Sequence, residues 1–407
     1  MADAKRCFFY LAVVTIFSSF TYLYITASQW KEIYESTTLD RISFNNNTSA
    51  RNKQIPPVII SPSSSYNESS ADRKKNKVIF QPTWAGKKEG LPLIKQLNQL
   101  FARQMSFVGC EFSNCVFNSS TNLSEIANAD VILLRFSIHL PPGTVSKEVR
   151  QRQLWIVHSH EPSGLSHWQP SINSYNGTMT YRFDSTIYFP FGETTLRDKP
   201  DHTPNDYSRG KSKGAFAYVS NCAGLSGKRL PLMKALSKHI IINIYGRCTN
   251  NAPCLRGDRV CEGATHSEHR FYLSFENSLC KDYITEKFWK ALYSAGNFVP
   301  VVIGGTSMAE YTRVAPPDSF IHAYNFSSID SLGEYLRHLM NDDAAYNRYH
   351  EWRHKYNVKS FTIPHESVCK LCQLANHPEQ LQPNQQRNFA EEFNLPSNCK
   401  PARSLFS

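Results

Sequence analysis

Ionisable and amide side chains crowd into one short stretch, FYLSFENSLCKDYITEKFWKAL, residues 271–292. Its first residues alternate between apolar and polar, with Phe271, Leu273 and Phe275 on one face, which is typical of a strand. From about Thr285 the apolar spacing becomes helical. The polar side chains of this corner are Glu276, Asn277, Lys281, Asp282, Tyr283, Glu286 and Lys287. The pattern therefore predicts a chemical site where a strand ends and a helix begins.

A corner of this kind suits an anionic ligand. In open parallel sheets, ligands lie beyond the carboxyl ends of the strands, where helix N-termini offer N–H groups to anions. Lys287, in the first turn of the expected helix, could bind a phosphate as a point charge. Glu286 could accept hydrogen bonds from two sugar hydroxyls, as a carboxylate does for a ribose. The spacing alone is equally consistent with a pair that only caps and solvates the helix start.

Strand and helix patterns alternate on both sides of this corner. Upstream, KVIFQPTW and ADVILLRFS read as strands, LPLIKQLNQLFARQ reads as a helix, and SKEVRQRQLWIVHSHEPSG reads as a helix that feeds a strand. The polar segment DHTPNDYSRGKSKG, residues 201–214, is interpreted as a linker, after which the alternation resumes. This βαβ order predicts an α/β protein with parallel sheets in two domains and a cleft between them.

The beginning of the chain differs in character from the rest. Residues 7–27 form an uncharged, largely apolar run, enough to cross a bilayer core of about 30 Å. Lys5 and Arg6 precede it, and a positive flank stays cytosolic. The run is long for a signal peptide and no convincing small-residue cleavage site follows, so we favour a membrane anchor over a cleaved signal. The Ser-, Asn- and Pro-rich residues that follow read as a flexible stem.

Two further features favour a luminal compartment. Ten of the eleven cysteines lie beyond the expected anchor, an even number available for bridging in an oxidising space. Glycosylation acceptor sequences of the form N-x-S/T occur at Asn46, Asn47, Asn67, Asn118, Asn122, Asn176 and Asn325.

The net charge of +11 points to acidic partners. Nucleic acid does not fit a luminal protein, whereas a phosphate-bearing small molecule or an anionic glycan does. Part of the charge has a simpler explanation, because a lysine-rich stem segment such as DRKKNK is commonly only solvated.

The corner resembles the donor-binding signature of the α1,3-fucosyltransferases, with F-E-N-S and D-Y-I-T-E-K both intact. The resemblance extends to YVSNC, YGRC, VPVVIG, DSFIHAYNFSS, NGTMTYRFDSTIYFPFG and CKLC, and leaves out the stem. It implies a GT-B fold with two Rossmann-like domains, preceded by a transmembrane helix and a flexible stem. It also implies inverting transfer of L-fucose from GDP-β-L-fucose to GlcNAc of a glycoprotein glycan, on the N-glycan core or on a LacNAc or LacdiNAc antenna.

The resemblance assigns roles within the corner and upstream of it. Lys287 and Arg229 are expected to face the diphosphate, although neighbouring Lys228 could replace Arg229. Asn277, Tyr283 and Glu286 are expected to shape the nucleotide pocket. No catalytic metal is implied, and the chain has no D-x-D, the carboxylate pair that holds a diphosphate-bound cation in many glycosyltransferases. No cofactor is therefore expected, although divalent ions could stimulate by screening product GDP.

An inverting displacement needs one base facing the acceptor hydroxyl. The family places it on a glutamate in an E-S-P-like loop after a strand. Here the strand is LWIVHSH and the loop EPSG, so Glu161 is the expected base, although the Ser between Glu and Pro is missing. In a rival interpretation, His158 and His160 join Glu161 as metal ligands.

Cys369 and Cys372 could be a redox pair, a zinc half-site or structural bridges. The resemblance favours bridges, from Cys110 and Cys115 to this terminal pair. The cysteines left without an assigned pairing are Cys222, Cys248, Cys254, Cys261, Cys280 and Cys399. Cys254, Cys261 and Cys280 depart from the vertebrate Lewis-type pattern, which favours an acceptor in the N-glycan core.

The expected organisation is a cytosolic tail at 1–6, an anchor at 7–27, a stem at 28–77, an acceptor-binding domain at 78–205, a GDP-fucose-binding domain at 206–360 and a return segment at 361–407. This describes a single-pass type II protein of the Golgi membrane with a luminal head. Its expected partners are GDP-fucose, a glycoprotein N-glycan and the Golgi membrane, without nucleic acid, and a homodimer stays open. The main alternative is an inactive or lectin-like homologue that binds glycan or GDP-fucose without turnover.

Overall fold

The computed structural model describes residues 76–82, 105–135, 140, 143–162, 174–201, 203, 205–222, 229–251, 266–305, 307–360, 363–381, 387–388 and 398–400. The expected anchor, nearly all of the stem, and Asn46, Asn47 and Asn67 lie outside these residues. Within the described part of the chain, every helix is too short or too polar to cross a membrane.

The first sheet has six strands in the order β2-β1-β3-β4-β6-β7, and all its pairings are parallel. Its strands are β1 (Lys77–Pro82), β2 (Cys115–Ser120), β3 (Val131–Arg135), β4 (Leu154–Ser159), β6 (Gly177–Thr180) and β7 (Ile187–Tyr188). The expected helix before β4 is the short α4 (Lys147–Gln151), and a 3-10 turn at Leu123–Asn128 precedes β3. The predicted helix in residues 91–104 lies outside the described residues.

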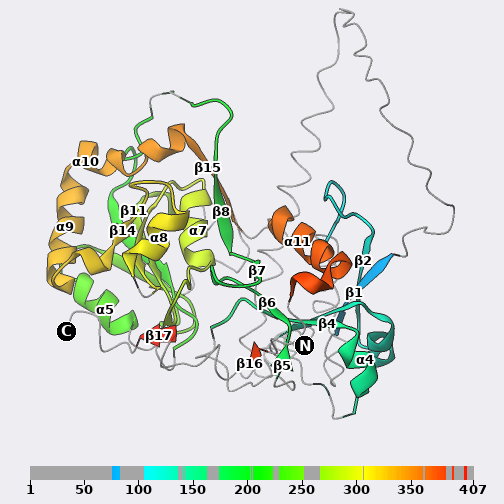
Figure 1. Ribbon diagram of the computed structural model, residues 1–407. Helices are drawn as coiled ribbons and strands as arrows, with labels where there is room; N and C mark the ends of the chain where they lie inside the picture. Colours follow the sequence, from blue (N-terminus) through cyan, green and yellow to red (C-terminus); the bar gives the residue numbers. More distant parts are fainter. Residues whose placement is uncertain are drawn as a thin grey trace, which may run out of the picture.

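The second sheet has five parallel strands in the order β10-β9-β11-β13-β14. They are β9 (Lys213–Tyr218), β10 (Ile242–Tyr245), β11 (His269–Phe275), β13 (Val299–Ile303) and β14 (Ile321–His322). The accompanying helices are α5 (Arg229–Leu236), α7 (Glu286–Tyr293), α8 (Met308–Val314), α9 (Ile329–Asn341) and α10 (Asp343–Arg348). Figure 1 shows the two sheets as separate α/β units, each with its own helices. The predicted α/β class with two parallel sheets is confirmed.

Strand β11 is more deeply buried than its alternating sequence suggests. All seven of its residues are buried, including Tyr272 and Ser274 on the face that the pattern marks as polar. Phe271 shares a core cluster with side chains of α5 and α9, whereas Tyr272 packs in a different cluster with Ala291 of α7. Helices therefore cover both faces of the strand, as is usual in parallel sheets.

Segments late in the chain pair or pack with elements that precede the second sheet in sequence. Helix α11 (His365–Asn376) shares a core cluster with strands of the first sheet, and Figure 1 places it beside β1 and β2. Strand β15 (Tyr356–Ser360) pairs antiparallel with β8 (Gly192–Leu196), and the short β16 (Arg387–Asn388) pairs with β5 (Ser174–Tyr175). Helix α11 and β16, both within the expected return segment, thus pack on the first unit.

Candidate active site

The strand–helix corner forms as its sequence predicts. Strand β11 ends at Phe275 and α7 begins at Glu286, with Thr285 as its N-cap. The Thr285 side chain accepts the backbone N–H of Lys287, which satisfies one of the exposed donors at a helix start. Ser274 Oγ donates to the Lys287 carbonyl at 3.1 Å, so the first turn of α7 is tied to the strand.

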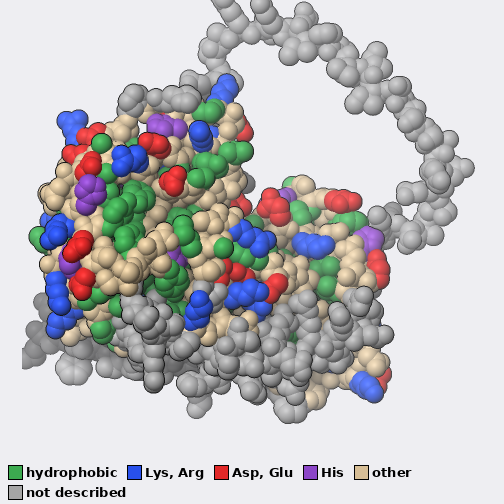
Figure 2. Space-filling model, turned by 60° about the vertical axis from the view of Figure 1, so that its left-hand side comes forward, with side chains coloured by type: hydrophobic (Ala, Val, Ile, Leu, Met, Phe, Trp, Pro, Cys, Tyr) green, Lys and Arg blue, Asp and Glu red, His purple; other side chains and the backbone are tan. Residues whose placement is uncertain are grey.

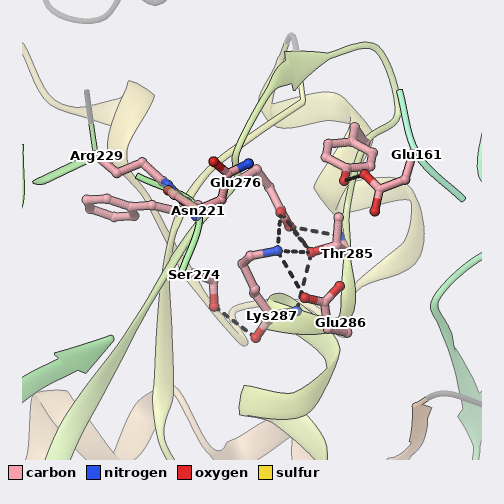
Figure 3. A network of polar contacts seen from close by, with 10 residues as sticks. Glu161, Asn221, Arg229, Ser274, Glu276, Thr285, Glu286 and Lys287 are labelled. Atoms are coloured by element: carbon pink, nitrogen blue, oxygen red, sulfur yellow. Dashed lines mark hydrogen bonds and ion pairs between the residues drawn. The ribbon is translucent and has the colours of Figure 1, made fainter. Parts of the chain in front are cut away.

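The Lys287 ammonium lies at the centre of a network at this corner. Its Nζ contacts Glu276 Oε2 at 3.2 Å, Glu286 Oε1 at 3.0 Å and Thr285 Oγ1 at 2.9 Å. Figure 3 shows it between the two carboxylates, with Arg229 on one side and Glu161 on the other. Lys287 is therefore more than the isolated point charge expected from the sequence, because it holds two carboxylates in place.

Glu276 is the more deeply buried of the two carboxylates in this network. Its side chain has no exposed surface, and Oε1 accepts the Thr285 backbone N–H at 2.8 Å. Gly304 makes room for it, because a Cβ at that position would lie 2.6 Å from Glu276 Cγ and 2.5 Å from the Tyr311 hydroxyl. A buried carboxylate needs such pairing, since an uncompensated charge in the interior is costly.

Burial and charge act in opposite directions on these groups. Burial raises the pKa of Glu276, although the Lys287 charge partly offsets it. Burial alone would raise the pKa of Glu286 too, but the charge and hydrogen bond of Lys287 hold it below the usual value. For Lys287, burial would lower the pKa, but the two carboxylates raise it above the usual value. Lys287 is thus fully charged at neutral pH.

Glu161 faces this corner from the first unit. It follows β4, where its backbone N–H donates to Ser159 Oγ at 3.0 Å and its carbonyl accepts the same hydroxyl at 2.9 Å. The Tyr283 hydroxyl donates to Glu161 Oε2 at 3.0 Å. Tyr283 is 2% exposed, so this bond is made in a protected environment. The side chain expected to shape the nucleotide pocket is thus directed at the expected base.

The pKa of Glu161 is raised to about 7. Burial is the main cause and the charge of Glu286 adds to it, whereas Lys287 and the Tyr283 hydrogen bond act in the opposite direction. A carboxyl group with a pKa near the working pH is well suited to general base catalysis.

Two further side chains approach the corner from the second sheet. Arg229, at the start of α5, is 5% exposed and donates to the carbonyls of Phe275 at 3.0 Å and Asn221 at 3.1 Å. Asn277 directly follows Glu276, and within the described residues its buried Oδ1 has no hydrogen-bond partner. This oxygen is therefore available to accept a hydrogen bond. Lys228, the alternative to Arg229, lies outside the described residues.

The two histidines of the rival metal interpretation have other surroundings. The His160 ring stacks on Phe189 and Phe191, with centroid distances of 4.1 and 4.5 Å, and its Nε2 lies 3.0 Å from the Phe189 carbonyl oxygen. Burial lowers the pKa of His160 to about 4 and that of His158 well below its usual value. The structure therefore gives His160 an aromatic packing role next to Glu161.

The terminal cysteines form bridges, as the resemblance implies. Disulfides join Cys110 to Cys369 and Cys115 to Cys372, and so fasten α11 to the first unit. Cys110 and Cys369 lie close enough to His365 to resemble a metal cluster, but both sulfurs are already used in a disulfide. Two more disulfides join Cys222 to Cys248 and Cys280 to Cys399, whereas Cys254 and Cys261 lie outside the described residues.

Four of the glycosylation acceptor sequences lie in the described residues. Asn118, Asn122 and Asn325 are exposed. Asn176 is half-buried, and its Oδ1 accepts the Trp155 backbone N–H at 2.8 Å. Geometry thus favours the first three as acceptors, and occupancy stays a prediction at all of them.

Comparison with known proteins gives two adjoining family matches. Residues 208–391 match the family described as "Glycosyltransferase family 10 (fucosyltransferase) C-term", and residues 73–192 match "Fucosyltransferase, N-terminal". The chain is also 36% identical over 264 residues to human 4-galactosyl-N-acetylglucosaminide 3-alpha-L-fucosyltransferase FUT5, across 63% of this chain and 67% of that protein. The chain belongs to glycosyltransferase family 10.

Other family 10 relatives include alpha-(1,3)-fucosyltransferase fut-1 of Caenorhabditis elegans, 33% identical over 284 residues. That match covers 67% of this chain and 63% of the nematode protein, so the chain spans less than two thirds of that relative's length. A crystal structure of an α1,3-fucosyltransferase with GDP has a TM-score of 0.49 at 14% identity, over 78% of this chain and 95% of that one.

Within this family 10 site, Glu276 and Thr285 are the residues to which sequence analysis gave no role. Glu276 stands among the polar side chains of the corner, but nothing in the alternation predicts its complete burial. The available signal is its place directly after the central strand of a parallel sheet, where a polar side chain enters the interior. The apolar spacing marks Thr285 only as the approximate start of a helix, whereas its hydroxyl also contacts Glu276 and Lys287.

Proposed function

We propose that this protein is an inverting α1,3-fucosyltransferase that moves L-fucose from GDP-β-L-fucose to GlcNAc of a glycoprotein glycan. The observation that carries the proposal is Glu161, a carboxyl group with a pKa near 7 that faces the Lys287 network across the two units. Membership of family 10 supports fucosyl transfer, and the names of the similar α1,3-fucosyltransferases support the type of linkage.

Glu161 acts as the general base. In a direct displacement, the acceptor oxygen attacks the anomeric carbon of fucose from the side opposite to the leaving diphosphate. Glu161 takes the proton of the acceptor hydroxyl while the new bond forms. At neutral pH a substantial fraction of the group is ionised, and its raised pKa makes it a stronger proton acceptor than an ordinary glutamate.

The second unit binds the donor. The edge of its sheet at Phe275 and the start of α7 supply Asn277, Glu286 and Lys287, and Arg229 approaches from α5. We assign Arg229 and Lys287 to the charge that develops on the leaving diphosphate, because fixed cations stabilise such charge without reorganising. Asn277 Oδ1 accepts a hydrogen bond from the bound nucleotide, and Glu286 accepts one from a sugar hydroxyl. Two Rossmann-like domains used in this way correspond to a GT-B enzyme.

The protein cations make a divalent ion unnecessary in this proposal. We further propose a type II orientation in the Golgi membrane, anchored by residues 7–27 with the head in the lumen. The disulfides of the described part of the chain support an oxidising compartment. The acceptor is an N-glycan, with the core GlcNAc favoured by the extra cysteines of the sequence.

The proposal is tested by incubating purified protein with GDP-fucose and a panel of core-type and antennary N-glycans. We expect GDP release that depends on acceptor, and an α-linked product by NMR. Tight binding of GDP-fucose or glycan without GDP release would instead identify a lectin-like homologue. Acceptor-independent GDP release would show hydrolysis rather than transfer.

A further inference from the structure

The end of the described chain returns to the donor corner. Strand β17 (Cys399–Lys400) pairs antiparallel with β12 (Leu279–Cys280), and a disulfide joins Cys280 to Cys399 across 119 residues of sequence. Tyr283 follows Cys280 by only three residues, and its backbone N–H donates to the Cys280 carbonyl at 3.1 Å. The C-terminal segment is thus attached directly to the loop that carries the partner of Glu161.

Asn398, next to β17, contacts both units. Its backbone carbonyl accepts the Lys281 N–H at 2.7 Å, and its Oδ1 accepts Arg182 Nη1 at 3.0 Å. Lys281 belongs to the donor corner, whereas Arg182 follows β6 of the first sheet. Arg182 is 8% exposed, so its bond to Asn398 is largely shielded from water, where losing one partner costs most.

Ion pairs and a backbone hydrogen bond join the same two segments. Arg182 forms a two-pronged contact with Asp184, at 2.8 Å from Nε and 2.6 Å from Nη2, and Lys281 Nζ reaches Asp184 at 3.0 Å. The Phe183 N–H donates to Asp282 Oδ2 at 3.1 Å. Figure 2 shows basic and acidic side chains close together where the two units meet. Residues 182–184 and 281–282 are thus held as one joint.

This joint fixes the backbone immediately before Tyr283. Asp282 has a φ of 60°, in the left-handed region that residues other than glycine adopt uncommonly. Contacts on both sides hold it there, since its N–H also donates to Glu310 Oε2 at 2.8 Å. Tyr283 then packs edge-on against Tyr181, with ring centroids 5.0 Å apart. Tyr181 precedes Arg182, so both ends of the joint position the Tyr283 ring.

We propose that Asn398 and Cys399 are positioning residues of the active site. Through the joint, they hold the Tyr283 hydroxyl on Glu161 and set the distance between the base and the donor corner. Neither residue contacts the reacting groups, and both act through Tyr283. The inference rests on the proposed fucosyl transfer.

The main test is the double variant Cys280→Ser/Cys399→Ser. We expect kcat to fall by about 10- to 100-fold with little change in KM for GDP-fucose, because displacements of about 1 Å at a reacting centre cost up to 10² in rate. The midpoint of the acidic limb of the pH–rate profile should move upward, because Glu161 would still face Glu276, Glu286 and Lys287 but would lose its hydrogen bond.

Variants of Asn398 distinguish an effect on the position of Tyr283 from a general loss of stability. Asn398→Ala removes the acceptor for Arg182 and should lower kcat and raise the pH midpoint in the same direction as the cysteine variant. Asn398→Asp keeps an acceptor oxygen and should restore both. These single variants also keep the inference testable if the double cysteine variant fails to fold.

The matched control is Cys110→Ser/Cys369→Ser, which removes a disulfide at α11, away from the donor corner. We expect it to lower the melting temperature while the pH midpoint stays that of the wild type. Hydrogen exchange of residues 279–285 supplies a readout independent of turnover, and it should quicken only in Cys280→Ser/Cys399→Ser. If Cys280→Ser/Cys399→Ser kept both the pH midpoint and the hydrogen-exchange rates of the wild type, the inference would be overturned. An inactive wild type would contradict fucosyl transfer alone, and the exchange data would still decide the positioning role.

Discussion

The Tyr283 hydroxyl donates to Glu161 Oε2 at 3.0 Å, although 122 residues separate the two in sequence. Glu161 belongs to the loop after β4 in the first unit, and Tyr283 belongs to the donor corner of the second. This bond therefore connects the proposed base to the donor-binding elements. It also stabilises the ionised carboxylate, and so opposes the burial that raises the pKa of Glu161.

Glu161→Gln should bind GDP normally and transfer fucose at least 10²-fold more slowly, because general base catalysis typically contributes 10²–10⁴ in rate. The amide keeps the shape of the side chain but cannot accept the proton. In the wild type, kcat/KM should rise with pH through about 7 as Glu161 loses its proton. This acidic limb should be absent from any residual activity of the variant.

A matched control for this prediction is Glu193→Gln. Glu193 is a carboxylate of β8 whose Oε1 is paired with Lys359 Nζ at 3.1 Å. We expect near-normal transfer, since this pair lies between β8 and β15 and has no contact with Glu161 among the described residues. If Glu161→Gln transfers at the wild-type rate while Glu193→Gln or Asp184→Asn does not, the base lies elsewhere.

Tyr283→Phe should move the acidic limb to higher pH. The hydroxyl lowers the pKa of Glu161, so its removal lets burial and the charge of Glu286 raise that pKa further. A hydrogen bond to a charged group contributes about 1.5–3 kcal/mol, which corresponds to roughly one to two pH units. The measurement is kcat/KM between pH 5 and 9. Tyr335→Phe, which loses a bond to Tyr349, should leave the midpoint unchanged, and an unmoved midpoint in Tyr283→Phe would refute the coupling.

The sequence predicts the fold best where a long periodic pattern determines the element. The sequence predicts the strand that ends at Phe275 and the helix that begins near Glu286. It also predicts that the strands of both sheets run parallel, because βαβ units allow few arrangements. The two-residue pairing of Cys280 with Cys399 was not predictable, since so short an element has no period. The burial of Ser274 also escapes the pattern, because burial depends on α7 packing against that face.

The sequence predicts which residues belong to the site better than it predicts the contacts between them. Family motifs bring Glu161 and Lys287 into one reaction, but a motif does not state which side chain neutralises which. The structure shows that Glu276 forms an ion pair with Lys287 and that the Tyr283 hydroxyl donates a hydrogen bond to Glu161. Both contacts depend on how the chain folds in three dimensions, and neither is encoded in sequence spacing.

Lys287→Ala should lower kcat/KM for GDP-fucose and also destabilise the fold. Its removal leaves Glu276 buried without its cation, a change that typically costs 3–5 kcal/mol. The stability loss is measured by denaturant unfolding and the functional loss by kcat/KM for GDP-fucose. The double variant Glu276→Gln/Lys287→Met should recover much of the stability but none of the activity. Wild-type kcat/KM in Lys287→Ala would contradict a role at the diphosphate.

Activity should persist in EDTA. The chain has no D-x-D, and the proposed charge partners of the diphosphate are Arg229 and Lys287. Added divalent ions should at most raise the rate by screening released GDP. The test is the initial rate of transfer in chelator, with the same sample resupplied with Mg²⁺ or Mn²⁺. Complete loss that the metal restores would show a required cation.

Glu161→Gln should stabilise the protein at alkaline pH. The folded pKa of about 7 lies above the ordinary value of 4.5, so the folded state holds the Glu161 proton more tightly than the unfolded state. Ionising Glu161 therefore lowers the free energy of unfolding as pH rises from about 4.5 to 7, and the penalty is complete above 7. Each pKa unit corresponds to 1.36 kcal/mol, so a rise from 4.5 to about 7 gives a full penalty of about 3 kcal/mol.

The amide of the variant does not ionise and avoids this penalty. The difference in unfolding free energy between Glu161→Gln and the wild type should therefore be small at pH 4.5, grow toward pH 7, and stay constant up to pH 8.5. Urea unfolding at each pH measures it, with Glu193→Gln as the control for a half-buried carboxylate paired with a lysine. A difference that does not depend on pH would show that Glu161 titrates as an ordinary glutamate, and the group would then be too weak a base for the proposed role.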